Sequence, residues 1–221
     1  MKAAQVVLRL LIEDKFGINR NIHCQVRQLS QCKMSKKALV FLAAGTEEME
    51  FVIAADTLTR GGIAVTIAGL PDSSLVKCSR GVNIKPDIAV SEAKSRGPFD
   101  VLVLPGGLGG AKAMAESQEV GALLKEQEKS GRIIAAICAA PTALKAHGIA
   151  IGKNITSYPS MKDQMVEGGK YNYLDDKVVV DGNIITSKGP GTSFDFALTI
   201  VEKLVGKEKA SEVAKGMLIC Y

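Results

Sequence analysis

Residues 132–144 read RIIAAICAAPTAL, an unbroken apolar strand that runs directly into small residues that open a helix. This order places Cys138 on a sharp turn from strand to helix, a geometry that presents nucleophiles in other folds. Ala136, Ala139 and Ala140 are small enough to let the chain reverse there. The N–H groups and positive dipole end of the following helix would lower the pKa of the thiol from about 8.5. We therefore expect a reactive thiolate at Cys138, the alternative being a small core residue.

Strands and helices alternate on both sides of this stretch. The apolar patterns and turn residues predict strands at 37–43, 63–68, 99–104, 133–137 and 155–158, hairpins at 75–84 and 177–187, and helices at 47–60, 118–129, 139–148, 162–166 and 191–205. Continuous apolar strands need helices on both faces of their sheet. The pattern predicts a single α/β domain at 36–221, doubly wound around a mostly parallel sheet.

Composition excludes several classes of protein. The 221 residues are 47% hydrophobic and 23% charged, as in an ordinary soluble domain. Five cysteines and two histidines show no CxxC pair and no zinc-like spacing, so we expect a reducing compartment, no disulfide framework and no metal. No apolar run reaches the roughly 18 residues that a membrane span needs.

Residues 1–35 form a basic extension outside the predicted domain. They hold six Lys and Arg against two acids, a charge of +4, whereas residues 36–221 hold 22 against 21, a charge of +1. The near-neutral body argues against a stable nucleic-acid surface. Two interpretations of the extension stay open: a cleaved organellar address, which Arg9 permits and Glu13 and Asp14 oppose, or a disordered extension. Met34 would be an alternative start for a cytosolic form.

The turns after several parallel strands lie at one edge of the predicted sheet, where these strands have their carboxyl ends. Ligand sites of doubly wound sheets lie outside this edge. These turns are 45–50, 105–107, 138–139 and 187–192, of which the last contains Pro190.

Glu50 lies one turn inside the apolar face of the helix at 47–60, where Glu47 and Glu48 are available for solvent. A carboxyl turned toward the sheet edge would be desolvated and its pKa raised, so its proton could bond to a thiolate. We therefore interpret Glu50 as a functional acid, and Glu47 and Glu48 as exposed residues of the first turn.

The run of glycines at 106–110 fits neither common phosphate-loop pattern. The backbone N–H groups of Gly107 and Ala139 are instead expected to converge as an oxyanion hole. A Cys-His dyad is excluded, since His147 lies nine residues after Cys138, roughly 13 Å along a helix. Arg60 and Arg80 are interpreted as solvated charges, with an anion-holding role at the site as the alternative.

The chain closely resembles the Parkinsonism-associated deglycase group of the DJ-1/PfpI superfamily. The segments that carry the resemblance are ALVFLAAGTEEMEFV, VLVLPGGLGGAKAMAES, LLKEQEKSGRIIAAICAAPTALKAHG and TSKGPGTSFDFAL. They spread over nearly all of residues 36–221 and exclude the extension.

This resemblance implies a flavodoxin-like homodimer without a cofactor. Cys138 would be an oxidation-sensitive nucleophile and Glu50 its protonated partner, with Gly107 and Ala139 as oxyanion donors. Arg60 and Arg80 would lie near this pocket at the dimer interface. Tyr158, also assigned to the pocket with Pro190, stands where vertebrate members carry a histidine. Ala139 stands where protease-like relatives carry a histidine, and this argues against a peptidase.

The activities implied are removal of methylglyoxal and glyoxal adducts from proteins and nucleotides, and glyoxalase action without glutathione. The alternative is a non-enzymatic redox sensor and chaperone that uses stepwise oxidation of Cys138. The expected location is the cytoplasm, with the nucleus or, through the extension, the mitochondrion as further sites. Both functions depend on the same residues.

Overall fold

A computed structural model describes residues 35–221, so the expectations for the basic extension, including Met34, lie outside the described residues. The central element is a seven-stranded sheet in the order β10-β11-β7-β6-β1-β2-β5, in which only the β10 to β11 pairing is antiparallel. Its strands are β1 (Lys37–Ala43), β2 (Ala64–Leu70), β5 (Ile88–Ala89), β6 (Val101–Leu104), β7 (Ile133–Ile137), β10 (Val178–Asp181) and β11 (Ile184–Ser187). The predicted α/β fold with a mostly parallel sheet is confirmed.

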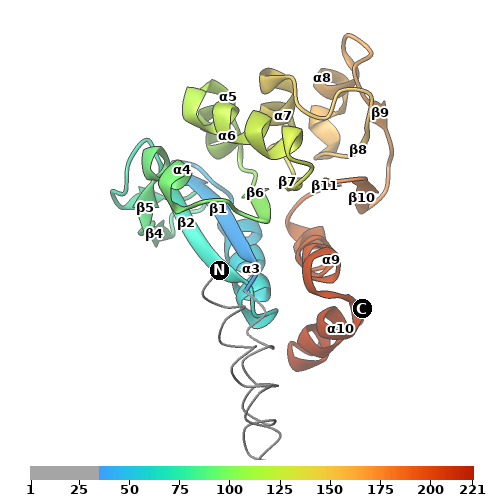
Figure 1. Cartoon of the computed structure of the whole chain (residues 1–221). Helices are drawn as coiled ribbons and strands as arrows, with labels where there is room; N and C mark the ends of the chain where they lie inside the picture. The colour runs from blue at the N-terminus through green and yellow to red at the C-terminus, as the bar shows by residue number, and fades with distance from the viewer. Residues whose placement is uncertain (1–34) are drawn as a thin grey trace, which may run out of the picture. The chain divides into compact units, whose positions relative to one another are not determined.

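Helices cover both faces of the sheet (Figure 1). They are α3 (Glu48–Arg60), α4 (Ala93–Arg96), α5 (Leu108–Glu116), α6 (Gln118–Lys129), α7 (Pro141–His147), α8 (Lys162–Val166), α9 (Ser193–Val205) and α10 (Lys207–Gly216). Successive side chains of β1 point to opposite faces of the sheet, so they belong to two separate parts of the core. Leu39 and Phe41 pack with residues of α5, α6 and α7, whereas Val40 and Leu42 pack with residues of α3 and α9.

Two small sheets complete the domain. β3 (Val76–Lys77) and β4 (Asn83–Ile84) pair as the predicted antiparallel hairpin, and β8 (Asn154–Ile155) pairs in parallel with β9 (Asn172–Tyr173). The predicted strand at 155–158 is therefore shorter and begins one residue earlier. In the described part of the chain, no helix has the length and apolar character to cross a membrane.

Helix α5, which begins directly after the predicted turn at 105–107, and helix α10 were not predicted. Glycine is needed in α5 because the helix packs directly on the turn after β1. A Cβ on Gly109 would lie 2.8 Å from the carbonyl oxygen of Ala44, and one on Gly110 would lie 2.6 Å from Oγ1 of Thr46. These glycines therefore allow close contact between a helix and a turn, a tertiary requirement that local propensity does not reveal.

Candidate active site

Cys138 occupies the turn between β7 and α7 with a φ of 64°, a left-handed conformation that is rare for a residue with a side chain. Its N–H donates to the carbonyl of Ser187 on β11 at 2.9 Å, and its carbonyl accepts from the N–H of Tyr158 at 2.8 Å. Only 8% of the residue is exposed. The predicted sharp turn is confirmed, and its backbone strain is maintained by hydrogen bonds on both sides.

Glu50 is fully buried in the first turn of α3. Its Oε2 accepts a hydrogen bond from the N–H of Gly106 at 2.7 Å, and its own N–H donates to Oε2 of Glu47 at 2.8 Å. Its Oε1 has no hydrogen-bond partner within residues 35–221. Burial raises the pKa of Glu50 to about 7, and the charge of Glu47 adds to the rise, while hydrogen bonds from Cys138 and Gly106 oppose it. The predicted desolvation of this carboxyl is confirmed.

Gly106 lies between Glu50 and Cys138 and was missed by the sequence analysis. A Cβ at this position would lie 2.6 Å from the Cβ of Cys138 and 2.7 Å from Oε2 of Glu50. The acid and the thiol thus face each other across a backbone that has no room for a side chain. A strand followed by Pro-Gly-Gly signals a tight turn, but it does not reveal which glycine separates two functional groups.

The thiol of Cys138 does not have the lowered pKa that was predicted from the helix dipole. Burial raises its pKa to about 12, and ionised Glu50 adds to the rise, while the N–H groups of Gly107 and Ala139 lower it. The helix α7 has only seven residues and begins three residues after Cys138, so its dipole does not offset desolvation. Protonation of Glu50 would remove its charge from the causes that raise the pKa of the thiol and would leave burial, which the two backbone donors oppose.

Gly107 and Ala139, the two predicted oxyanion donors, lie near Cys138, and their N–H groups act to lower the pKa of its thiol. Gly107 has a φ of 80°, and a Cβ there would lie 2.2 Å from the carbonyl of Gly45. Only glycine satisfies both the conformation and the close approach. Two backbone donors thus converge on one sulfur.

Glu47 and Glu48 are buried, which corrects the prediction that they face solvent. Glu48 accepts hydrogen bonds from the hydroxyl of Ser79 at 2.8 Å and the N–H of Arg80 at 2.7 Å. Desolvation raises the pKa of Glu48, but hydrogen bonds from its own backbone, Ser79, Arg80 and Val82 outweigh this and lower it. The hairpin of β3 and β4 supplies these donors, so the sequence of α3 alone could not predict this burial.

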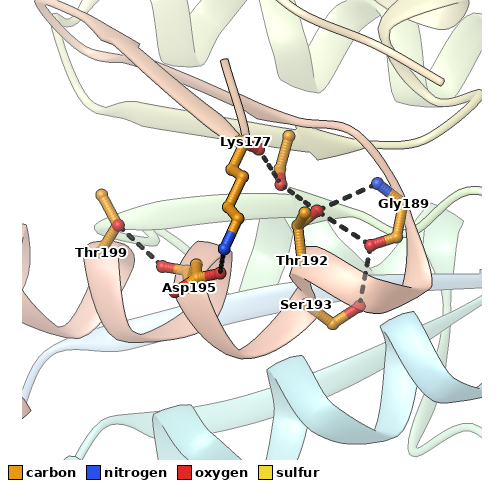
Figure 2. A network of polar contacts seen from close by, with 7 residues as sticks. Lys177, Gly189, Thr192, Ser193, Asp195 and Thr199 are labelled. Carbon is orange, nitrogen blue, oxygen red and sulfur yellow. Dashed lines mark hydrogen bonds and ion pairs between the residues drawn. The ribbon is translucent and has the colours of Figure 1, made fainter. Parts of the chain in front are cut away.

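Tyr158 and Gly189 lie beside the sulfur. A Cβ placed on Gly189 would be 3.2 Å from Cδ2 of Tyr158 and 4.0 Å from Sγ of Cys138. Pro190 follows Gly189 directly and begins the short 3-10 turn that leads into α9. Figure 2 shows Gly189 bound to Thr192 at the start of this helix. The structure thus brings Tyr158 and the turn containing Pro190 to the predicted site.

Arg60 and Arg80 make their side-chain contacts outside this cluster within the chain. Arg60 lies ten residues after Glu50 on α3, about 15 Å along the axis, and pairs with Asp56 at 2.7 Å. The guanidinium of Arg80 contacts the carbonyl of Ser79 at 3.4 Å. The prediction for a dimer interface concerns a second chain and stays a prediction.

Taken together, these groups can perform acid-base and nucleophilic chemistry at one carbon atom. The carboxyl of Glu50 titrates near neutral pH, the sulfur of Cys138 lies beside it, and two backbone N–H groups can stabilise negative charge. Within residues 35–221, no group of three or more His, Cys, Asp or Glu side chains is placed to hold a metal ion.

Comparison with known proteins agrees with this geometry. The crystal structure of Drosophila melanogaster DJ-1beta is 62% identical, with a TM-score of 0.82 over 85% of this chain and all of that one. Toxoplasma gondii DJ-1, solved as the oxidized protein, is 37% identical, with a TM-score of 0.79 over 85% of this chain and all of that one. A Caenorhabditis elegans relative named glutathione-independent glyoxalase DJR-1.2 is 47% identical over 83% of this chain and 97% of its own. The model of the DJ-1/PfpI family matches residues 36–203, and the chain belongs to this family.

Proposed function

We propose that this chain is a cysteine-dependent enzyme that acts on methylglyoxal and glyoxal and on their adducts with proteins and nucleotides, with glyoxalase-type activity. The observation that carries the proposal is the placement of two backbone donors and a buried carboxyl with an unpartnered oxygen around Cys138. The name of the nematode relative, a glutathione-independent glyoxalase, supports the same class of substrate.

The reactive form has the proton on Glu50 and the charge on the sulfur. Burial raises the pKa of both groups, and that of the thiol more, so the resting pair carries its proton on the sulfur and the reactive form arises when this proton passes to Glu50. A protonated Glu50 can donate from Oε1, the atom that otherwise has no partner. This arrangement removes the repulsion that ionised Glu50 exerts on the thiolate.

In the proposed reaction the thiolate of Cys138 attacks the aldehyde carbon of methylglyoxal, and a C–S bond replaces the π bond of the carbonyl. Gly107 and Ala139 stabilise the oxyanion until Glu50 protonates it. The resulting carboxylate removes the proton from the same carbon and returns it to the adjacent carbon, while the hydroxyl proton moves from the oxygen of the first carbon to that of the second, which gives a thioester of lactate. Water then cleaves the C–S bond, so methylglyoxal and water yield lactate and the free thiol. With an adduct, the C–S bond to Cys138 forms at the carbonyl-derived carbon as the bond from that carbon to the amine or thiol breaks, and protonated Glu50 supplies the proton of the leaving group.

The decisive experiment compares two buried cysteines. Cys138→Ser is expected to reduce lactate formation from methylglyoxal to the background rate, because the nucleophile is lost, while Cys78→Ser keeps most of the activity. Circular dichroism checks that both variants fold. Retention of turnover by Cys138→Ser would contradict the mechanism. The same assay on a glycated peptide separates action on adducts from action on free methylglyoxal.

A second candidate function is redox sensing with a chaperone role, in which oxidation of Cys138 to the sulfinate is the only chemical event. The two N–H groups and a protonated Glu50 would also stabilise a sulfinate, and the Toxoplasma gondii relative was solved as the oxidized protein. Formation of a sulfinate on Cys138 after mild peroxide, without lactate release by the reduced protein, would favour this alternative.

We further propose a homodimer. Met49 and Val52 on α3, and Leu75 and Val82 beside the hairpin of β3 and β4, leave large apolar side chains about half exposed or more. A second copy that covers them would bring its own Arg60 or Arg80 near the pocket. The mass of the protein in solution tests this, and a monomer at micromolar concentration would contradict it.

A further inference from the structure

Tyr158 leaves a large aromatic side chain 45% exposed directly beside the nucleophile. Its N–H donates to the carbonyl of Cys138 at 2.8 Å, so its backbone is fixed relative to the sulfur. Its ring lies against the Cα of Gly189, as the 3.2 Å distance to a Cβ placed there indicates. The ring of Tyr158 and Sγ of Cys138 thus both lie within 4.0 Å of one point, the Cβ position of Gly189.

Gly189 is required there for space rather than for conformation. Its φ of 164° and ψ of −166° describe extended backbone that any residue can adopt. A side chain at this position would press on the ring of Tyr158 and extend toward Sγ of Cys138. The position of the ring thus depends on the position of the Gly189 peptide.

A chain of hydroxyl groups fixes that peptide (Figure 2). Oγ1 of Thr192 accepts the N–H of Gly189 at 3.1 Å, and the N–H of Thr192 donates to the carbonyl of Gly189 at 2.8 Å. The hydroxyl of Ser187 donates its proton to the carbonyl of Lys177 at 2.7 Å. The Thr192 hydroxyl can therefore donate to Oγ of Ser187 at 2.7 Å, with the carbonyl of Gly189 at 2.9 Å as its other acceptor.

We propose that Tyr158 determines specificity at this site: its ring forms a flat wall beside Cys138 that favours electrophiles with an aromatic substituent over small aliphatic ones. Thr192 is a positioning residue, which acts on the wall through Gly189. Stacking of two aromatic groups corresponds to a preference of about threefold to tenfold. The choice of arylglyoxals as preferred substrates rests on the proposed function, whereas the wall itself requires only a reactive thiol.

The first test therefore uses alkylation of Cys138 rather than turnover. The thiolate adds to the carbon-carbon double bond of a maleimide, and water supplies the proton to the other carbon. Rates for N-phenylmaleimide and N-ethylmaleimide are measured by mass spectrometry of the peptide that contains Cys138. Their ratio is divided by the same ratio for glutathione, which removes the intrinsic difference between the reagents.

The wild type and Tyr158→Phe are expected to favour the phenyl reagent by about threefold to tenfold, because both keep the ring. Tyr158→Ala is expected to lower the corrected ratio to about one. Tyr221→Ala serves as the matched control, since Tyr221 is 46% exposed but bonds to Glu202 on α9. A ratio near one in the wild type, or an unchanged ratio in Tyr158→Ala, would overturn the proposal.

Thr192→Val and Thr192→Ser test the positioning role, because valine removes the hydroxyl at similar size and serine retains it. We expect the corrected ratio to fall about twofold or more in Thr192→Val and to be kept in Thr192→Ser. Equal ratios in the two variants would remove Thr192 from the proposal.

The final measurement compares kcat/KM for phenylglyoxal and methylglyoxal in the wild type and in Tyr158→Ala. A fall of about threefold or more in the relative preference for phenylglyoxal supports the wall, and an unchanged preference overturns its role in substrate choice. Absence of all turnover with a preserved maleimide preference would refute the proposed function and leave the wall supported.

Discussion

Two turns of this protein each bury a cysteine against the first turn of α3, and their chemistry differs. Cys138 lies in the turn after β7, and Cys78 lies in the hairpin turn after β3. Both are less than 10% exposed. Burial raises the pKa of Cys78 to about 11, and the charges of Glu48 and Glu47 raise it further, with no opposing hydrogen bond. Cys138 has two backbone donors and a carboxyl that can carry the proton. Burial alone therefore does not distinguish a reactive cysteine from an inert one.

The carboxyl groups opposite the two cysteines show the same contrast. Glu48 faces the hairpin turn, whose N–H and hydroxyl donors lower its pKa. Glu50 faces Cys138 with one oxygen unpartnered, and burial raises its pKa to about 7. Two residues in one helical turn thus become an anion and an acid because of the donors that other segments supply. Variants at Gly106, Glu50 and Glu48 test this difference, and Cys138→Ser and Cys78→Ser test it at the cysteines themselves.

The largest effect is expected from substitution of the glycine beside Cys138. Gly106→Ala places a Cβ less than 3 Å from Cys138, Glu50 and the carbonyl of Ile137, so we expect a loss of about 4 kcal/mol or more in the free energy of unfolding. In the hairpin turn, a Cβ on Gly81 meets nothing within 4 Å, and only its φ of 97° opposes alanine, at a cost of about 1–2 kcal/mol. Urea denaturation measures both variants. Equal losses would mean that the two turns are equally tolerant.

The second effect concerns pH and Glu50. Its pKa rises from 4.5 in the unfolded chain to about 7 in the folded protein, so the folded state binds this proton more tightly. This contribution to stability is complete below pH 4.5 and is lost as the pH rises through 7. The unfolding free energy of the wild type should therefore fall relative to that of Glu50→Gln as the pH rises from 4.5 to 8, by up to about 3 kcal/mol. A constant difference between the two proteins over this range would show that Glu50 titrates normally.

The smallest effect has the opposite dependence on pH. The pKa of Glu48 is lowered in the folded protein, so its contribution to stability is present above its unfolded pKa and is lost as the pH falls through the folded value. We expect Glu48→Gln to cost about 1–2 kcal/mol at pH 7 and less in acid, because a charged acceptor of several hydrogen bonds is lost. Thermal unfolding at pH 7 and pH 4 measures this, and a cost that grows in acid would exclude an ionised Glu48.

Local sequence patterns were sufficient for the main strands of the large sheet, for the turn that holds Cys138 and for the burial of Glu50. Apolar strands that end in small residues predict a parallel sheet and the edge at which its site lies. An acid on an apolar helical face predicts a buried carboxyl with a raised pKa. The burial of Glu48 was not predictable in the same way, because its donors lie more than 30 residues away in a hairpin. The helix α5 was missed because its glycines serve contact with a distant turn. The distance of Arg60 from Glu50 follows from the length of α3, whereas its assignment to the pocket came from the family resemblance.

The backbone of Cys138 is bound to β11 through its N–H and to Tyr158 through its carbonyl. A peptide held at both ends cannot rotate to release its strained conformation without breaking a contact to another segment. In the proposed reaction, motion is therefore confined to the side-chain torsion of the cysteine and to the incoming molecule. The sulfur returns to the same place after every reaction, and the entropy of aligning the reactants is lost when the protein folds rather than at each encounter.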